Sequence, residues 1–203
     1  MTGDSDLTIL QPTTPINVNI DATGFQGALT AIGGGTSGND TLIGGNGNDI
    51  LTGGGTGTIN RLVGGLGSDL LKGGGGTNTF VFSIAGSNAG SFAGGTTDTY
   101  DTVNTFAEGT DKIELSGGVF NTTSIVSQSA VQTAVGSAST LSAALGSAAT
   151  AIGAGKFGSF TFGSDTYILG NDATVGTLNQ SDLLIKLAAV TPTLTATDFT
   201  FSA

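Results

Sequence analysis

Carboxylate and carboxamide side chains recur at nearly constant intervals through the glycine-rich part of the chain. The positions are Asp40, Asp49, Asn60, Asp69 and Asn78, so the intervals are 9, 11, 9 and 9 residues. Asp carboxylates combined with backbone carbonyls form the oxygen-only ligand sets that favour a hard cation such as Ca²⁺. The chain has 15 acids and 5 bases, a formal net charge of −10. A divalent cation would supply the missing counter-charge.

The composition excludes several other kinds of chemistry. Cysteine and histidine are absent, which removes thiolate and imidazole metal sites, cysteine nucleophiles and histidine-based triads. The sequence has no G-x-S-x-G elbow and no recognisable pair of catalytic carboxylates, so we expect no enzymatic activity. The few bases form no basic patch for nucleic acid, and no apolar run is long enough for a transmembrane segment.

Each recurring polar residue follows a glycine-rich stretch and precedes apolar residues. The clearest copies are Gly44–Asp49 before Ile50-Leu51 and Gly64–Asp69 before Leu70-Leu71. Glycine tolerates positive φ and close backbone approach, so each stretch predicts a tight turn and each apolar pair a short strand. These tandem units, over residues 33–82, resemble the RTX nonapeptide repeat G-G-x-G-x-D-x-U-x, in which U is a large aliphatic residue.

The resemblance implies a mainly β fold, a right-handed parallel β-roll in which two units form one coil and calcium lies between stacked turns. Units two apart share an edge, so Asp49 stacks on Asp69, and Asp40 on Asn60 and Asn78. We expect the strongest site at Asp49/Asp69, a weaker one at Asp40/Asn60, and a poor site or none at Asn60/Asn78. A glycine-rich solenoid without metal is the alternative. The ligands predicted within the repeats are Asp40, Gly44, Asn46, Asp49, Asn60, Gly65, Gly67 and Asp69.

Residues 97–116 are similar to the segment that follows the roll in RTX proteins. The local pattern predicts that residues 100–106 pair with residues 112–115 around a turn at Glu108-Gly109. The resemblance adds a further calcium ion at Asp101 and Asp111. Thr105 and Glu114 stand where the family pattern has Asp. The matching positions are Asp101, Phe106, Gly109, Asp111, Lys112, Ile113, Leu115 and Ser116.

The C-terminal third of the chain combines helical and strand patterns. Apolar residues at helical spacing predict one or two short α-helices within residues 126–152. Alternation after Lys156 predicts an antiparallel hairpin turning at residues 163–165, and residues 183–187 predict another strand. Asp165, Asp172 and Asp182 are candidate ligands there or, alternatively, solvated turn residues. The expected parts are an N-terminal strand and loop segment (1–32), the β-roll (33–85), a post-roll β segment (86–125) and a helix-plus-β C-terminal region (126–203).

The two ends of the chain bear on its location. Residues 198–203, an acid followed by apolar residues, resemble the uncleaved type I secretion signal of RTX proteins, and the N-terminal residues lack the pattern of a Sec signal peptide. The sequence thus predicts a non-catalytic calcium-binding module that passes through a type I secretion apparatus. Calcium would then fold the module outside the cell or at a bacterial surface. The alternative is a structural or adhesive surface-layer module that self-assembles in calcium.

Overall fold

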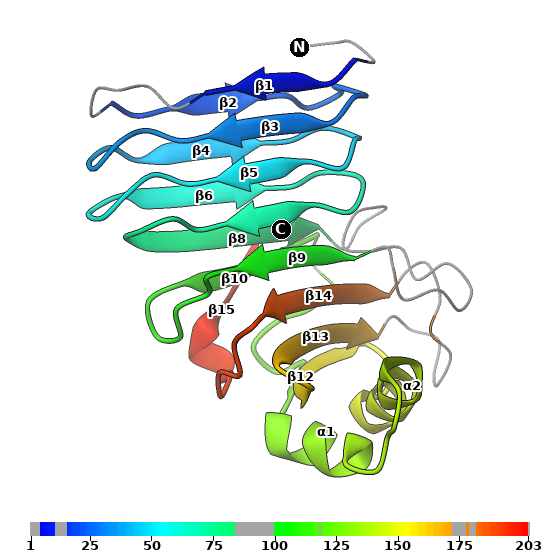
Figure 1. The fold of residues 1–203 in the computed structure, drawn as a ribbon. Helices are drawn as coiled ribbons and strands as arrows, with labels where there is room; N and C mark the ends of the chain where they lie inside the picture. The colour runs from blue at the N-terminus through cyan, green and yellow to red at the C-terminus, as the bar shows by residue number, and fades with distance from the viewer. Residues whose placement is uncertain are drawn as a thin grey trace.

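The computed structural model describes residues 5–10, 16–83, 100–117, 119–171, 178 and 182–202. Its strands form a nine-stranded and a six-stranded sheet (Figure 1). In spatial order, the larger sheet contains β1 (Leu7–Ile9), β3 (Leu29–Ile32), β5 (Ile50–Thr52), β7 (Leu70–Lys72), β9 (Asp101–Asn104), β14 (Leu183–Ala188), β13 (Asp165–Asn171), β12 (Lys156–Phe162) and β11 (Ile125–Val126). The smaller sheet contains β15 (Phe199–Ser202), β10 (Lys112–Ser116), β8 (Thr77–Ser83), β6 (Ile59–Val63), β4 (Asp40–Ile43) and β2 (Asn19–Asp21).

The chain alternates between the two sheets as it advances, and this alternation makes a parallel β-roll. Odd-numbered strands from β1 to β9 pair in parallel in the larger sheet, and even-numbered strands from β2 to β10 pair in parallel in the smaller one. One strand from each sheet makes one coil, as the repeat spacing predicts. Figure 1 shows these coils stacked from the N-terminal end (blue) toward the helices.

Inward-facing apolar side chains, at least one from each strand of two central columns, build the core of the roll. Because the strands are paired in register, these side chains stack directly on one another in two columns, and their burial drives the stacking of coils. In the smaller sheet the column is Ile20, Leu42, Leu62, Phe80, Ile113 and Phe199. In the larger sheet it is Ala31, Leu51, Leu71, Val103 and Leu187.

Strands β9 and β10 form another coil rather than a hairpin. The prediction that residues 100–106 pair with residues 112–115 is wrong, because β9 pairs with β7 while β10 pairs with β8 in the opposite sheet. The turn between them does lie at the predicted place, where Asp111 N donates to Ala107 O at 2.8 Å. In this arrangement Val103 and Ile113 are both fully buried, in opposing columns.

The last part of the chain closes the end of the roll. Strands β12 and β13 form the predicted antiparallel hairpin, β14 returns beside β9, and β15 adds in parallel to β10. Both sheets therefore contain strands that precede residue 33 and strands that follow residue 85.

Two short helices lie at this end, as the apolar spacing predicts. They are α1 (Gln128–Val135) and α2 (Leu141–Ile152). A second buried cluster joins them to one face of the hairpin and β14 through Phe160, Tyr167 and Leu184. The opposite face of these strands packs into the core of the roll through Phe157, Ile168 and Ile185. No helix in the described part of the chain is long and apolar enough to cross a membrane.

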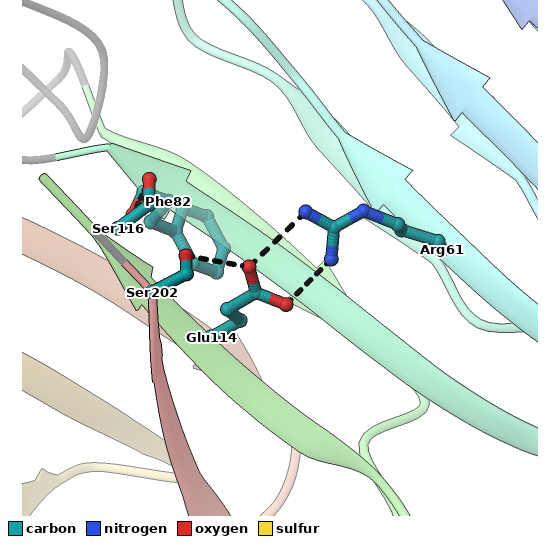
Figure 2. A network of polar contacts seen from close by, with 5 residues as sticks. All are labelled: Arg61, Phe82, Glu114, Ser116 and Ser202. Atoms are coloured by element: carbon teal, nitrogen blue, oxygen red, sulfur yellow. Dashed lines mark hydrogen bonds and ion pairs between the residues drawn. The ribbon is translucent and has the colours of Figure 1, made fainter.

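A polar network connects the repeats to the C-terminal strand (Figure 2). Arg61 on β6 reaches across β8 and forms a bidentate ion pair with Glu114 on β10. Its Nη1 donates to Oε2, and its Nη2 donates to Oε1 at 3.1 Å. Ser202 Oγ on β15 donates to Glu114 Oε1 at 2.8 Å. Glu114, which stands where the family pattern has Asp, thus accepts hydrogen bonds from strands on both sides of β10.

Candidate calcium sites along one edge of the roll

Three buried carboxylates stack on one edge of the roll, and we call Asp49, Asp69 and Asp101 the acidic column. Asp69 Oδ1 accepts from Asp49 N, and Asp101 Oδ1 accepts from Asp69 N, each at 2.8 Å. All three residues are at most 2 % exposed. The ion pairs found within the described residues join Arg61 to Glu114 and Lys186 to Asp165, so none of them neutralises this column.

The turn that begins at Gly44 brings a carboxylate and a carbonyl to the same small space. A Cβ atom added to Gly44 would lie 2.1 Å from both Asp49 Oδ2 and Gly64 O. Neither oxygen carries a hydrogen when Asp49 is ionised, so they cannot bond to each other. Calcium takes oxygen ligands at about 2.3–2.6 Å. Two oxygens that converge where only glycine leaves room therefore fit a cation held between successive turns.

Asp69 has a further feature that fits a cation. Its Oδ2 atom is fully buried and has no hydrogen-bond partner. A buried, unpartnered carboxylate oxygen is costly, and in native proteins it is usually explained by a water or an ion. The same oxygen lies 2.1 Å from the point that a Cβ on Gly64 would occupy, so it lies in the position equivalent to that of Asp49 Oδ2.

The electrostatics of the acidic column disfavour three negative charges in the absence of a cation. Burial, and then the charge of Asp49, raise the pKa of Asp69 to about 7 from an ordinary value of 3.8. Burial and the charge of Asp69 raise the pKa of Asp101 well above its usual range, and burial also raises the pKa of Asp49. A divalent cation beside these groups would favour their charged forms.

A second set of polar residues lies on the opposite edge, and we call Asp40, Asn60, Asn78 and Asp111 the mixed column. Asp40 accepts from Val18 N and Gly34 N, both at 2.9 Å. The register places Asp40 beside Asn60 and Asn60 beside Asn78, as the repeat spacing predicts. Asp111 follows Asn78 in this column, whereas Asp101 lies in the acidic column. The structure thus does not bring Asp101 and Asp111 together, as a shared calcium ion would need.

The remaining predicted ligands lie in the turns on the edge of the acidic column. Gly65 and Gly67 have φ of +106° and +117°, and a Cβ there would lie 2.2 Å from Gly45 O and 2.3 Å from Gly47 O. Asn46 N donates to Phe25 O at 2.7 Å. The sequence interpretation missed Gly64, whose carbonyl faces Asp49. Its place as the first glycine of a repeat, equivalent to that of Gly44, is the signal that could have identified it.

The structure describes two of the three C-terminal candidate acids. Asp165 forms an ion pair with Lys186 at 2.9 Å and Asp182 is buried, while Asp172 lies outside the described residues. In the part of the chain that the structure describes, no three acidic side chains gather in a cluster that could hold a metal ion. A cation on the acidic column would therefore take much of its coordination from backbone carbonyls.

Comparison with known proteins agrees with this architecture. No curated protein matches the chain. Residues 34–58 and 54–83, which contain β4 to β8, match the family model of the RTX calcium-binding nonapeptide repeat. The chain therefore carries RTX repeats, a family of calcium-binding nonapeptide repeats.

Proposed function

We propose that the protein is a non-catalytic module that binds calcium along the acidic column and needs the ion to complete its fold. The observation that carries this proposal is the convergence of Asp49 Oδ2 and Gly64 O on one space, one turn away from the unpartnered Asp69 Oδ2. Asp49, Asp69 and the Gly64 carbonyl would hold the ion between the two turns. Asp101, the next member of the column, would extend the site beyond the repeats.

In the described ion pairs, no basic side chain neutralises the acidic column, so a calcium ion would supply the positive charge there. The ion would join successive coils at an edge where carboxylates otherwise repel one another. The apolar contribution per coil is small, since each strand buries about one large side chain in the column. Binding free energy from the ion would therefore be folding free energy.

We further propose that folding follows export through a type I secretion apparatus, so that the protein is extracellular or at a cell surface. With calcium scarce inside a cell, the roll would stay unfolded there and could pass through the secretion apparatus. The C-terminal strand supports this order of events. Phe199 is buried, and its ring lies 4.8 Å from that of Phe157 between centroids. An export signal formed by the C-terminal strand would be accessible to the secretion apparatus only before the chain folds.

A calcium titration tests the proposed function. Wild-type protein is to be followed by far-UV circular dichroism and isothermal titration calorimetry in calcium, with magnesium as the competing hard cation. We expect a cooperative gain of β signal with calcium only. Asp49→Ala/Asp69→Ala should lose most of this response. Asp21→Ala, which removes an exposed acid from β2, is the matched control and should respond as wild type does. Full folding in EDTA with no heat of calcium binding would overturn the proposal.

A second test uses the space above Gly44 rather than the charge beside it. Gly44→Ala places a methyl group 2.1 Å from both Asp49 Oδ2 and Gly64 O, where the ion would lie. We expect calcium affinity to fall strongly. Gly146→Ala, on α2 with no atom within 4 Å of the added Cβ, should not lower it. Equal affinities for the two variants would place the ion elsewhere.

Calcium-dependent self-assembly is a second candidate, favoured by the N-terminal end of the roll. There β1 and β2 are the outermost strands of their sheets, and Leu10 and Ile16 nearby are 74 % and 47 % exposed. An unpaired sheet edge is a template for another chain. Sedimentation velocity with and without calcium distinguishes the candidates, because a secretion module stays monomeric and an assembling module grows.

A further inference from the structure

The mixed column contains a turn that is equivalent to the candidate site at Gly44 but differs in one atom. A Cβ added to Gly53 would lie 2.5 Å from Gly73 O and 2.8 Å from Asn60 Nδ2. At Gly44 the corresponding neighbours are Gly64 O and Asp49 Oδ2. The amide nitrogen of Asn60 thus occupies the place of the Asp49 carboxylate oxygen, opposite an equivalent glycine carbonyl.

This exchange of oxygen for nitrogen turns a repulsive contact into a hydrogen bond. Asn60 Nδ2 donates to Gly73 O at 3.1 Å and to Asn78 Oδ1 at 2.9 Å, and Thr58 Oγ1 also lies within 2.9 Å. The amide orientation follows from its partners. Nδ2 faces these acceptors, whereas Oδ1 faces the Gly54 N–H at 3.3 Å. Where the acidic column has two oxygens and no hydrogen between them, the mixed column has an N–H.

The hydrogen bonds continue to the end of the mixed column. Asn78 donates from its backbone N and from Nδ2 to Asp111 Oδ1, each at 2.9 Å. Asp111 Oδ2 accepts from Ala107 N at 2.8 Å. The buried side-chain atoms without a partner in the described residues are Asp69 Oδ2 and Asn171 Oδ1, and neither belongs to this column.

We propose that the amides of Asn60 and Asn78 take the place of calcium on this edge, and that these two residues determine which edge of the roll binds the ion. The inference rests on the proposed function for the acidic column and extends it. Calcium closes one edge, and on the other the side-chain amides of Asn60 and Asn78 join the turns from Asn60 to Asp111 without metal. One edge of the roll therefore has closing contacts that need no metal, while the other edge needs calcium.

Converting the amides to carboxylates tests the proposal. Asn60→Asp/Asn78→Asp removes two N–H donors and places carboxylate oxygens opposite Gly73 O and Asp111. We expect at least one additional calcium ion per chain by isothermal titration calorimetry and a lower thermal midpoint in EDTA than wild type. Asn39→Asp is the control. It makes the same change at an exposed residue of this edge, whose Oδ1 accepts from Ile59 N at 3.0 Å, and should leave the ion count unchanged.

The reciprocal variant covers the case in which the first fails to fold. Asp49→Asn/Asp69→Asn installs amides on the acidic column and should bind fewer calcium ions than wild type. Its thermal midpoint should also differ less between EDTA and calcium. An unchanged ion count in Asn60→Asp/Asn78→Asp overturns the inference. If Asn60→Asp/Asn78→Asp does not fold in calcium, the test passes to Asp49→Asn/Asp69→Asn. The inference is overturned when calcium raises the thermal midpoint of this reciprocal variant as much as it raises that of wild type. Wild-type protein that binds no calcium refutes the proposed function instead, so the two failures are distinct.

Discussion

Raising the pH of the metal-free protein from about 5 to about 8 is expected to destabilise it. The cause is the acidic column, whose carboxyl groups are buried together. The pKa of Asp69 is about 7 in the folded chain, against 3.8 for an ordinary Asp. Between these values the folded state binds a proton that the unfolded state has released. Stability from this group is thus fully present below about pH 4 and is lost as the pH rises through 7.

The size of the effect follows from the same two values. The gap between 3.8 and about 7 corresponds to about 4 kcal/mol of unfolding free energy from Asp69 alone. Domains of this kind have a total of about 5–15 kcal/mol. Loss of the Asp69 contribution would therefore leave the metal-free roll marginal at neutral pH. Glu114 acts outside this window, because its hydrogen bond to Arg61 lowers its pKa and its contribution is lost only as the solution becomes more acidic than about pH 4.5.

Urea unfolding followed by circular dichroism measures this effect. Titrations at about pH 5, 6, 7 and 8 are run in metal-free buffer and again in saturating calcium. In metal-free buffer we expect the unfolding free energy to fall as the pH rises. In saturating calcium we expect it to rise with pH, because the ionised carboxylates would bind the cation. Asp69→Asn should flatten the metal-free profile. A metal-free stability that rises between pH 5 and 8 would refute the reasoning.

Four further substitutions test other parts of the fold by urea unfolding in calcium. Leu62→Ala opens the buried column of the smaller sheet and should cost about 2–5 kcal/mol. Gly146→Ala, inside α2 with space around it, should gain about 1 kcal/mol. Thr105→Asn should gain about 1 kcal/mol, because φ is 65° at this β-branched residue and Asn tolerates that conformation. Glu114→Gln should cost about 1 kcal/mol or less, and less at high salt, since its partner Arg61 is 43 % exposed.

The repeated turns and the pairing of units could be predicted because their causes are local and periodic. Units that recur at a nearly constant interval are expected to stack, so the proximity of Asp49 to Asp69 and of Asn60 to Asn78 followed from counting residues. The helices and the β12–β13 hairpin followed from apolar spacing and a glycine turn. The expectation of a poor calcium site or none at Asn60/Asn78 stays a prediction, and the hydrogen bonds of the two amides support it.

The placement of Asp101 and Asp111 could not be predicted in this way. A polar–apolar alternation on either side of a turn is the same whether its two strands pair with each other or enter opposite sheets. The second arrangement rests on long-range pairing of β9 with β7 and of β10 with β8, which buries Val103 and Ile113 in two facing columns. That choice sends the two acids to opposite edges.

The sequence by itself therefore determined the repeating coil and the two columns of polar residues within it, and it predicted calcium as the bound cation, because these depend on residue type and interval. The tertiary structure decided that segments beyond the repeats, including β14 and β15, complete the same two sheets. It also decided that Asp69 Oδ2 is left without a hydrogen-bond partner, whereas Asp49 Oδ2 accepts from Gly45 N. Both depend on contacts between residues far apart in the chain, because only the packing of the whole chain pairs the strand edges and surrounds the buried charges.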